Sequence, residues 1–331
     1  MVVDYTGLVF KYPVNRRLTE GEWRGQLKQT EQLELVPLAH LWTIRLNSTY
    51  LEMVGKFYDW KGWATLVLSI AAGGILWFLS GLVWVVSTRP EGYADRAGDM
   101  CLIVGMGVLA APIVAFAVWG LTREVFRLTH YPIRLNRKTR KLYAIDPKTL
   151  EVIEADWDKM VFTLQPCLRL HWLKQHEILG HVMADDGSTV LKTVPFSMVW
   201  DVKEHLMRHW EYMRRYMEVG PEAVFDHTPV CLPIAEHKET YVFGLQFLIM
   251  NATGHSLMMT LSLPLELLSS IGRYIAIQTS RTPTWPACVD AECALEAGDP
   301  YAIDSKNNPA KFWSNASKRR SELVQLGLVG R

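Results

Sequence analysis

The 331-residue sequence lacks an excess of charge of either sign. Lys and Arg together number 35, Asp and Glu number 34, and the formal net charge at pH 7 is +1. This balance excludes a strongly basic nucleic-acid-binding protein and a protein with an acidic tail. We therefore expect no nucleic-acid partner.

The short motifs that mark common enzyme classes are also missing. The sequence has no glycine-rich dinucleotide fingerprint after a strand, no P-loop, no GxSxG nucleophile elbow and no set of kinase motifs. It shows no internal repeat with a period of about 20–50 residues. It thus specifies no enzyme and no cofactor, although a membrane-bound enzyme with an unrecognised site stays as an alternative.

Histidines do not occur at the spacing of a metal site. His176 and His181 resemble an HExxH motif, but they are five residues apart and would point in different directions on a helix or a strand. His205 and His209 would share one helix face. We expect that face to be solvated, with an ion pair between the neighbouring Glu204 and Arg208. The sequence therefore predicts no metal.

Two long stretches contain no charged residue, namely residues 63–87 and 101–121. As helices they would be roughly 38 and 32 Å long, enough to cross a hydrocarbon core of about 30 Å. We expect two transmembrane helices in place of two buried core helices. The lack of charges inside them argues against a transporter or a channel. Glycines would let the two helices approach closely: Gly73, Gly74, Gly81, Gly105 and Gly107.

Cations are few in the segment between the two stretches and many after the second one. The positive-inside rule therefore predicts a periplasmic loop at residues 88–100 and cytosolic termini, in a multi-pass protein of a bacterial inner membrane. The first sixty residues or so contain no apolar region of a cleavable signal peptide. The five cysteines fit this topology, because Cys101 lies at a span edge and Cys167, Cys231, Cys288 and Cys293 lie in the predicted cytosolic part, where thiols stay reduced.

A third apolar stretch follows near the end of the sequence. Residues 241–250 are too few to cross a bilayer, and residues 257–277 include Pro264, Glu266 and Arg273. We expect an amphipathic helix at residues 264–278, buried in the domain or lying on the membrane surface. A third full span is the alternative.

From residue 131 onward the apolar pattern has a period of two, which predicts β-strands. We expect seven strands, followed by an amphipathic helix that Ser197 caps and that runs to about residue 219. The predicted strands are at residues 131–136, 141–146, 150–154, 157–164, 168–174, 177–183 and 189–195.

This order is typical of a pleckstrin-homology-like (PH-like) antiparallel barrel closed by a C-terminal helix, and the alternative is an open antiparallel sheet packed on a helix. The predicted fold class is an α+β membrane protein. Its parts are an N-terminal cytosolic arm (1–62), a transmembrane hairpin (63–121), the PH-like module (122–220) and a C-terminal cytosolic extension (221–331).

One basic cluster lies on the first predicted hairpin of this module. Each cation close to an anionic leaflet contributes roughly 1 kcal/mol of attraction, so this cluster is a candidate site for lipid headgroups or a protein partner. A solvated hairpin that only enforces the topology is the alternative. The candidate residues are Arg134, Arg137, Lys138, Arg140 and Lys141.

Several short motifs give the sequence a family resemblance. It resembles an uncharacterised family of Gram-negative inner-membrane proteins, often encoded beside effectors of type VI secretion systems. The motifs are Ser48-Thr49-Tyr50-Leu51-Glu52, Lys61-Gly62, Tyr131-Pro132-Ile133-Arg134-Leu135-Asn136-Arg137, Asp156-Trp157, Trp285-Pro286 and Asp299-Pro300-Tyr301.

The resemblance implies an accessory or immunity role in competition between bacteria, with no catalytic residues. We therefore expect a non-enzymatic membrane protein whose cytosolic domain binds a protein partner, such as a cognate secreted effector that acts on membranes. The alternative is a membrane-anchored scaffold that binds lipid or protein.

Overall fold

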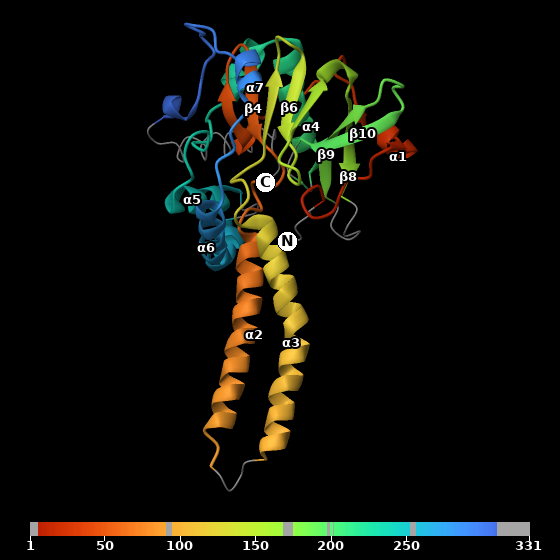
Figure 1. The fold of residues 1–331 in the computed structure, drawn as a ribbon. Coiled ribbons are helices and arrows are strands. Elements are labelled where there is room, and N and C mark those ends of the chain that lie inside the picture. The colour runs from red at the N-terminus through yellow and green to blue at the C-terminus, as the bar shows by residue number, and fades with distance from the viewer. Residues whose placement is uncertain are drawn as a thin grey trace.

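The protein consists of a compact head and a long helical hairpin that projects from one end of it (Figure 1). The computed structural model describes residues 6–90, 95–167, 175–196, 199–200, 202–251 and 256–309. The hairpin is formed by α2 (Trp63–Ser87) and α3 (Arg96–Glu124). These helices contain the two uncharged stretches of the sequence, and the mixture of helices with antiparallel sheets confirms the α+β class.

The head contains two five-stranded antiparallel sheets and no closed barrel in the part that the structure describes. The first sheet has the order β1 (Arg16–Arg17), β10 (Thr189–Pro195), β9 (His176–Met183), β8 (Val161–Pro166) and β2 (Gln26–Leu27). The second has the order β3 (Thr43–Leu46), β4 (Tyr50–Val54), β5 (Pro132–Asn136), β6 (Lys141–Ile145) and β7 (Val152–Asp156).

The predicted seven-stranded PH-like barrel is therefore wrong, because strands from residues before the hairpin complete both sheets. β4 pairs with β5 across the whole insertion, with Tyr50 opposite Asn136 and Val54 opposite Pro132. The segments on either side of the hairpin thus fold as one head. The predicted strand at residues 168–174 lies outside the described residues, and so does Ser197.

Helix α4 (Lys203–Glu218) supplies a large part of the core of the head. Its residues Leu206, Trp210 and Met213 are buried together with side chains of both sheets. Trp210 stacks on the ring of Trp157. Trp157 is the first residue of a 3₁₀ turn (Trp157–Lys159), where the sequence predicts the start of the fourth strand. The expectation of an amphipathic helix that packs on antiparallel strands is confirmed here.

The third apolar stretch forms two helices beside the base of the hairpin (Figure 1). They are α5 (Tyr241–Asn251) and α6 (Ser256–Thr279), and α6 continues through Pro264 and contains the predicted amphipathic segment. The described residues also form two short helices, α1 (Glu20–Arg24) and α7 (Ala287–Glu292).

Candidate membrane interface

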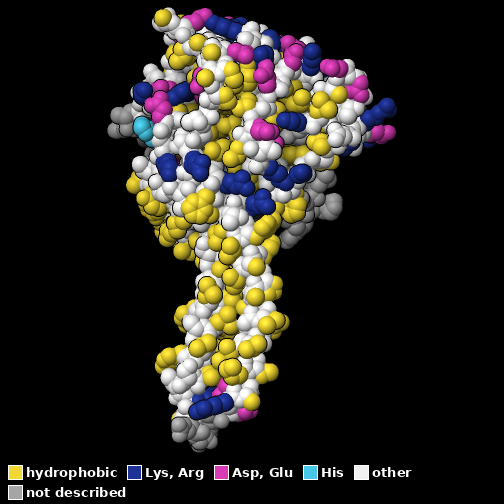
Figure 2. Space-filling model, viewed as in Figure 1, with side chains coloured by type: hydrophobic (Ala, Val, Ile, Leu, Met, Phe, Trp, Pro, Cys, Tyr) yellow, Lys and Arg dark blue, Asp and Glu magenta, His cyan; other side chains and the backbone are white. Residues whose placement is uncertain are grey.

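The hairpin exposes apolar side chains along nearly its whole length. The most apolar 18-residue window of α2 is 0% buried and that of α3 is 11% buried, and both helices are long enough to cross a membrane. Trp77 is 79% exposed. Figure 2 shows hydrophobic side chains covering the hairpin, with charged ones near its tip. Soluble monomers rarely expose apolar patches larger than a few hundred Å², so this surface is suited to lipid.

Close contact between α2 and α3 is concentrated near the head. Ala117 is almost fully buried, and a Cβ atom on Gly120 would lie 2.4 Å from a methyl carbon of Leu68. The expected close approach at the other glycines is wrong. A Cβ atom would meet no atom within 4 Å at Gly73, Gly74, Gly81, Gly105 or Gly107.

At the base of the hairpin, the last residue of α3 caps the first turn of α2. The carboxylate of Glu124 accepts hydrogen bonds from the backbone N–H of Gly62 (2.8 Å) and from the N–H (2.5 Å) and hydroxyl (2.6 Å) of Thr65. Backbone N–H groups at a helix N-terminus are unpaired and carry positive partial charge, so a buried carboxylate is stabilised there.

Lys61 makes the reciprocal cap at the C-terminal end of α3. Its buried ammonium donates to the carbonyl oxygens of Glu124 (2.6 Å) and Leu128 (2.9 Å). Burial lowers the pKa of Lys61 to about 8. Two antiparallel helices are thus joined by one anion at the positive end and one cation at the negative end.

Helix α6 is fixed to the same base by a buried ion pair. Arg273 donates from Nε to Glu239 (2.6 Å) and from Nη2 to its other oxygen (3.0 Å), and the guanidinium lies over the ring of Tyr58. The backbones of α6 and α2 meet at Gly272, where an added Cβ atom would lie 2.5 Å from the carbonyl oxygen of Gly62. This contact fixes the direction in which the hairpin leaves the head.

The side of α6 that faces away from this contact is apolar and exposed. α6 lies beside the head end of the hairpin (Figure 1), so its exposed apolar side chains continue the apolar surface of the hairpin onto the head. They are Leu263, Leu265, Leu267, Leu268, Ile271, Tyr274 and Ile275. Phe126, which is 71% exposed and has a left-handed backbone, adds an aromatic ring just after α3.

Cations surround this apolar end of the head. Lys and Arg side chains gather where the hairpin enters the head (Figure 2). Arg281 pairs by backbone with Arg127, and Lys148 lies near Lys11 and Arg123. Within the described ranges none of these five residues makes an ion pair, and their side-chain contacts are to carbonyl oxygens and one aromatic ring. We call Lys11, Arg123, Arg127, Lys148 and Arg281 the basic collar.

The basic residues singled out from the sequence lie elsewhere, around the far end of β5 and the turn that follows it. Arg134 is buried between the rings of Tyr50 and Trp285 and pairs with Glu52 and Asp290. β4 ends at Val54 and β5 begins at Pro132, on the side of the sheet next to the hairpin. The turn after Asn136 is therefore at the opposite end of these strands. Strands rise about 3.3 Å per residue, which places that turn roughly 15 Å farther from the hairpin.

The other four cations of that cluster are already bonded to other groups at the surface of the head. Arg137 donates to the carbonyl oxygen of Val219 at 2.9 Å. The remaining three pair with carboxylates: Lys138 with Glu296, Arg140 with Asp158 and Glu218, and Lys141 with Glu154 and Glu292. The geometry therefore favours the basic collar for contact with lipid.

The histidines that the sequence singled out are packed in the head. His181 is buried and hydrogen-bonded to Thr163 and Thr193. His205 and His209 are also buried, so the expectation that they lie on a solvated face is wrong. His209 packs its ring edge against Trp42, which comes from the segment before the hairpin. The Glu204–Arg208 ion pair is present at 2.6 Å.

Metal ligands and disulfides do not define a site in the described residues. No group of three or more His, Cys, Asp or Glu side chains there could hold a metal ion. The five cysteines are free thiols, of which Cys231 and Cys293 are buried. The burial of His209 against the distant Trp42 left no local signal in the sequence, and neither did the inclusion of Lys11 and Arg281 in the collar.

A family model matches residues 110–297, from the middle of α3 to just beyond α7, and its description is a family of unknown function, DUF6708. This chain belongs to the DUF6708 family. The matched segment contains β5 to β10, the half of α3 next to the head, and helices α4 to α7. No curated protein and no solved structure matches the chain.

Proposed function

We propose that this DUF6708 protein is a non-enzymatic binding protein of a bacterial inner membrane, with its head on the cytosolic side. The observation that carries this proposal is the almost fully exposed apolar hairpin, whose base is locked into the head by Glu124 and Lys61. A rigid junction of this kind holds the head at a fixed height and orientation relative to the bilayer.

The distribution of charge supports a cytosolic head. The basic collar lies at the head end of the hairpin and makes no ion pairs within the described residues. At the opposite end, Arg89 pairs with Asp99 at 2.7 Å, which neutralises one of the few cations there. Unpaired cations next to a span stay on the cytosolic side, where the leaflet is anionic.

For the partner, we propose a secreted effector that acts on membranes, with this protein protecting the cell that makes it. The proposal rests on the family resemblance of the sequence and on the requirement that such a protein reside in the target bilayer. A membrane-anchored scaffold that binds another protein or lipid is the alternative.

A protection assay tests this proposal directly. Cells that express the cognate effector should survive when the full chain is co-expressed. Ile70→Arg combined with Leu109→Arg places two charges on exposed apolar positions of the hairpin. Each charge costs roughly 2.5–3.5 kcal/mol of insertion, so this variant should lose protection.

The matched control places the same side chain on the head. Trp23→Arg changes an exposed residue of α1 and should protect as well as the native chain. Full protection by the double hairpin variant would contradict a role in the membrane. Survival that does not depend on the chain would contradict protection and would favour the scaffold.

A further inference from the structure

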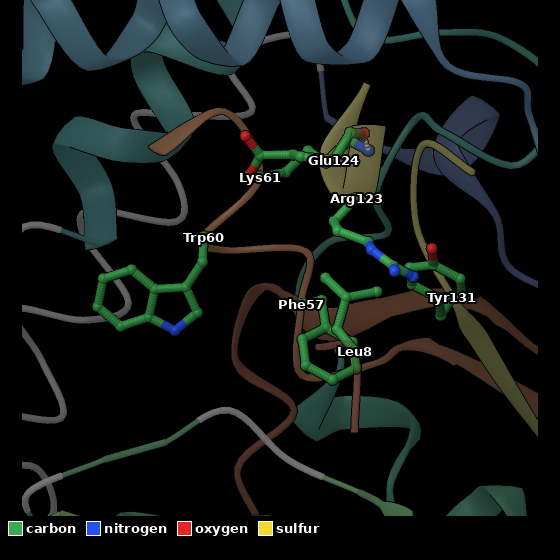
Figure 3. A pocket seen from close by; sticks show the side chains of 7 residues that line it. All are labelled: Leu8, Phe57, Trp60, Lys61, Arg123, Glu124 and Tyr131. Carbon is green, nitrogen blue, oxygen red and sulfur yellow. Dashed lines mark hydrogen bonds between the residues drawn. The ribbon is translucent and has the colours of Figure 1, made fainter. Parts of the chain in front are cut away.

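Three of the described residues that line a small pocket at the base of the hairpin carry hydrogen-bond donors without partners (Figure 3). Leu8 and Phe57 form its apolar side, and the Arg123 side chain extends toward Tyr131. Within the described residues, the Tyr131 hydroxyl, the Trp60 indole N–H and the Arg123 Nε–H are buried and lack a hydrogen-bond partner. Such groups are costly to leave unsatisfied, so three around one pocket indicate a missing acceptor.

The charges around this pocket favour an anionic acceptor. The ammonium of Lys148 lies close enough to Lys11 and Arg123 for both to disfavour its charge. Asp146 favours the charge of Lys148 in part, but burial and the two neighbouring cations outweigh it, and Glu124 is bonded to the first turn of α2. An excess of like charges creates a positive potential that attracts an anion.

The position and size of the pocket decide which anion fits. Arg123 is in the last turn of α3 and lies over the ring of Trp119, one turn farther along the apolar hairpin. The enclosed volume is about 10 Å³, enough for about one oxygen-sized group. A bulky soluble anion would not enter, whereas one phosphate oxygen could, with the rest of the group at the mouth beside Lys148.

We propose that this pocket binds the phosphate of an anionic phospholipid from the leaflet next to the head. Arg123 and Tyr131 donate to the phosphate oxygen that enters the pocket, and the buried side chains of Leu8 and Phe57 shield that oxygen from water. Burial raises the pKa of Tyr131 to about 12, so its hydroxyl keeps the proton that it donates. This inference rests on the proposed membrane location of the hairpin.

Thermal unfolding of the full chain in detergent tests the proposal, with micelles that contain phosphatidylglycerol or, at matched amounts, phosphatidylcholine. We expect phosphatidylglycerol to raise the melting temperature more than phosphatidylcholine, because a ligand that binds the folded state stabilises it. Tyr131→Phe removes only an unsatisfied hydroxyl, so it should melt no lower than the native chain without lipid and should lose the rise. Arg123→Gln should lose it too. Retention of phosphatidylglycerol in native mass spectra should fall about tenfold in both variants.

Arg281→Gln is the matched control, because it removes a collar cation that does not line the pocket. It should lose less of the effect of phosphatidylglycerol than Arg123→Gln does. An equal loss in Arg281→Gln and Arg123→Gln would overturn the pocket in favour of a diffuse electrostatic effect, and equal effects of the two lipids would overturn it outright. Inorganic phosphate is the third ligand tested. If it raised the melting temperature as much as phosphatidylglycerol does, the pocket would be a site for free phosphate and not for a lipid. Extraction of membranes with alkaline carbonate tests insertion separately, so failure of the pocket and failure of the membrane location give different results.

Discussion

At the scale of single residues, Glu124 and Lys61 determine how the hairpin is attached. Each side chain is buried, and each is satisfied by backbone groups at the end of a helix: Glu124 at the start of α2, Lys61 at the end of α3. Buried charges are tolerated when hydrogen bonds and opposite dipoles compensate for lost hydration. Here the hydrogen bonds of Glu124 and Lys61 join the two helices of the hairpin at the end next to the head.

We expect Glu124→Gln to destabilise the protein. The amide keeps one acceptor oxygen but loses the charge that faces Lys61 and the N-terminus of α2, which should cost about 2 kcal/mol. Thermal unfolding in detergent measures this loss. Glu20→Gln is the control, because its pair with Arg24 is exposed (side chains 90% and 82%) and should change stability by less than about 0.5 kcal/mol. Equal melting temperatures for the two variants would show that the cap is unimportant.

His209 makes the stability of the head depend on pH. Burial lowers its pKa from 6.5 to about 3, so the folded head keeps the imidazole neutral. In the unfolded chain the imidazole binds a proton below pH 6.5. Stability is therefore complete above that pH and is lost as the pH falls toward 3.

A pair of variants tests this dependence. At about pH 5 the loss from His209 should be about 2 kcal/mol relative to about pH 7.5. His209→Phe keeps an aromatic ring against Trp42 and should reduce the difference between melting temperatures at these two pH values. His237→Asn, at an exposed position, should not. An unchanged pH dependence in His209→Phe would disprove the assignment.

At the scale of elements, the crossing of α6 and α2 positions the hairpin. Gly272→Ala would place a Cβ atom 2.5 Å from the carbonyl oxygen of Gly62 and 2.8 Å from Cβ of Leu66. The backbone of Gly62 cannot shift without disturbing the helix packing, so we expect the free energy of unfolding to fall by about 1–3 kcal/mol. This loss should exceed the gain from the better helix propensity of alanine.

The control for this substitution is Gly73→Ala. The added methyl group would meet nothing within 4 Å, so this variant should unfold at the same temperature as the native chain or higher. Both variants are compared by thermal unfolding in the same detergent. A Gly272→Ala variant as stable as Gly73→Ala would mean that α6 does not pack on α2 in solution.

The elements also show what the sequence could predict. Composition alone indicates α2 and α3, since uncharged apolar runs of about twenty residues or more are typical of membrane-spanning helices. Alternating residues give β5, β6, β9 and β10 almost to the residue. The barrel was predicted incorrectly because β1 and β2 have two residues each, and because β4 finds its partner on the far side of the hairpin. Pairing between distant segments leaves no periodic signal.

The partners of the candidate cluster are hidden from the sequence for the same reason. Arg134 and its neighbours form a cluster in the sequence, but carboxylates that neutralise them come from residues 52, 218, 290, 292 and 296. The collar is assembled from separate segments, and only Arg123 and Arg127 are near each other in the chain. A count of nearby cations along the sequence could therefore find only part of the interface.

At the scale of the whole molecule, apolar surface and unpaired positive charge are arranged along one axis. The hairpin projects from one end of the head, α6 exposes its apolar side beside the hairpin base, and the collar lies at the same level (Figures 1 and 2). This order is the one that a protein needs to sit on an anionic leaflet with a helical hairpin through it.

Cysteine labelling of intact cells tests this central claim most directly. In a Cys101→Ser background, Thr88→Cys places a thiol at the hairpin tip, whereas the native Cys288 is exposed on the head. A membrane-impermeant maleimide should label Thr88→Cys in intact cells and leave Cys288 unlabelled, and inside-out vesicles should give the reverse. Labelling of Cys288 in intact cells, with the tip thiol protected, would contradict a cytosolic head on a membrane-spanning hairpin.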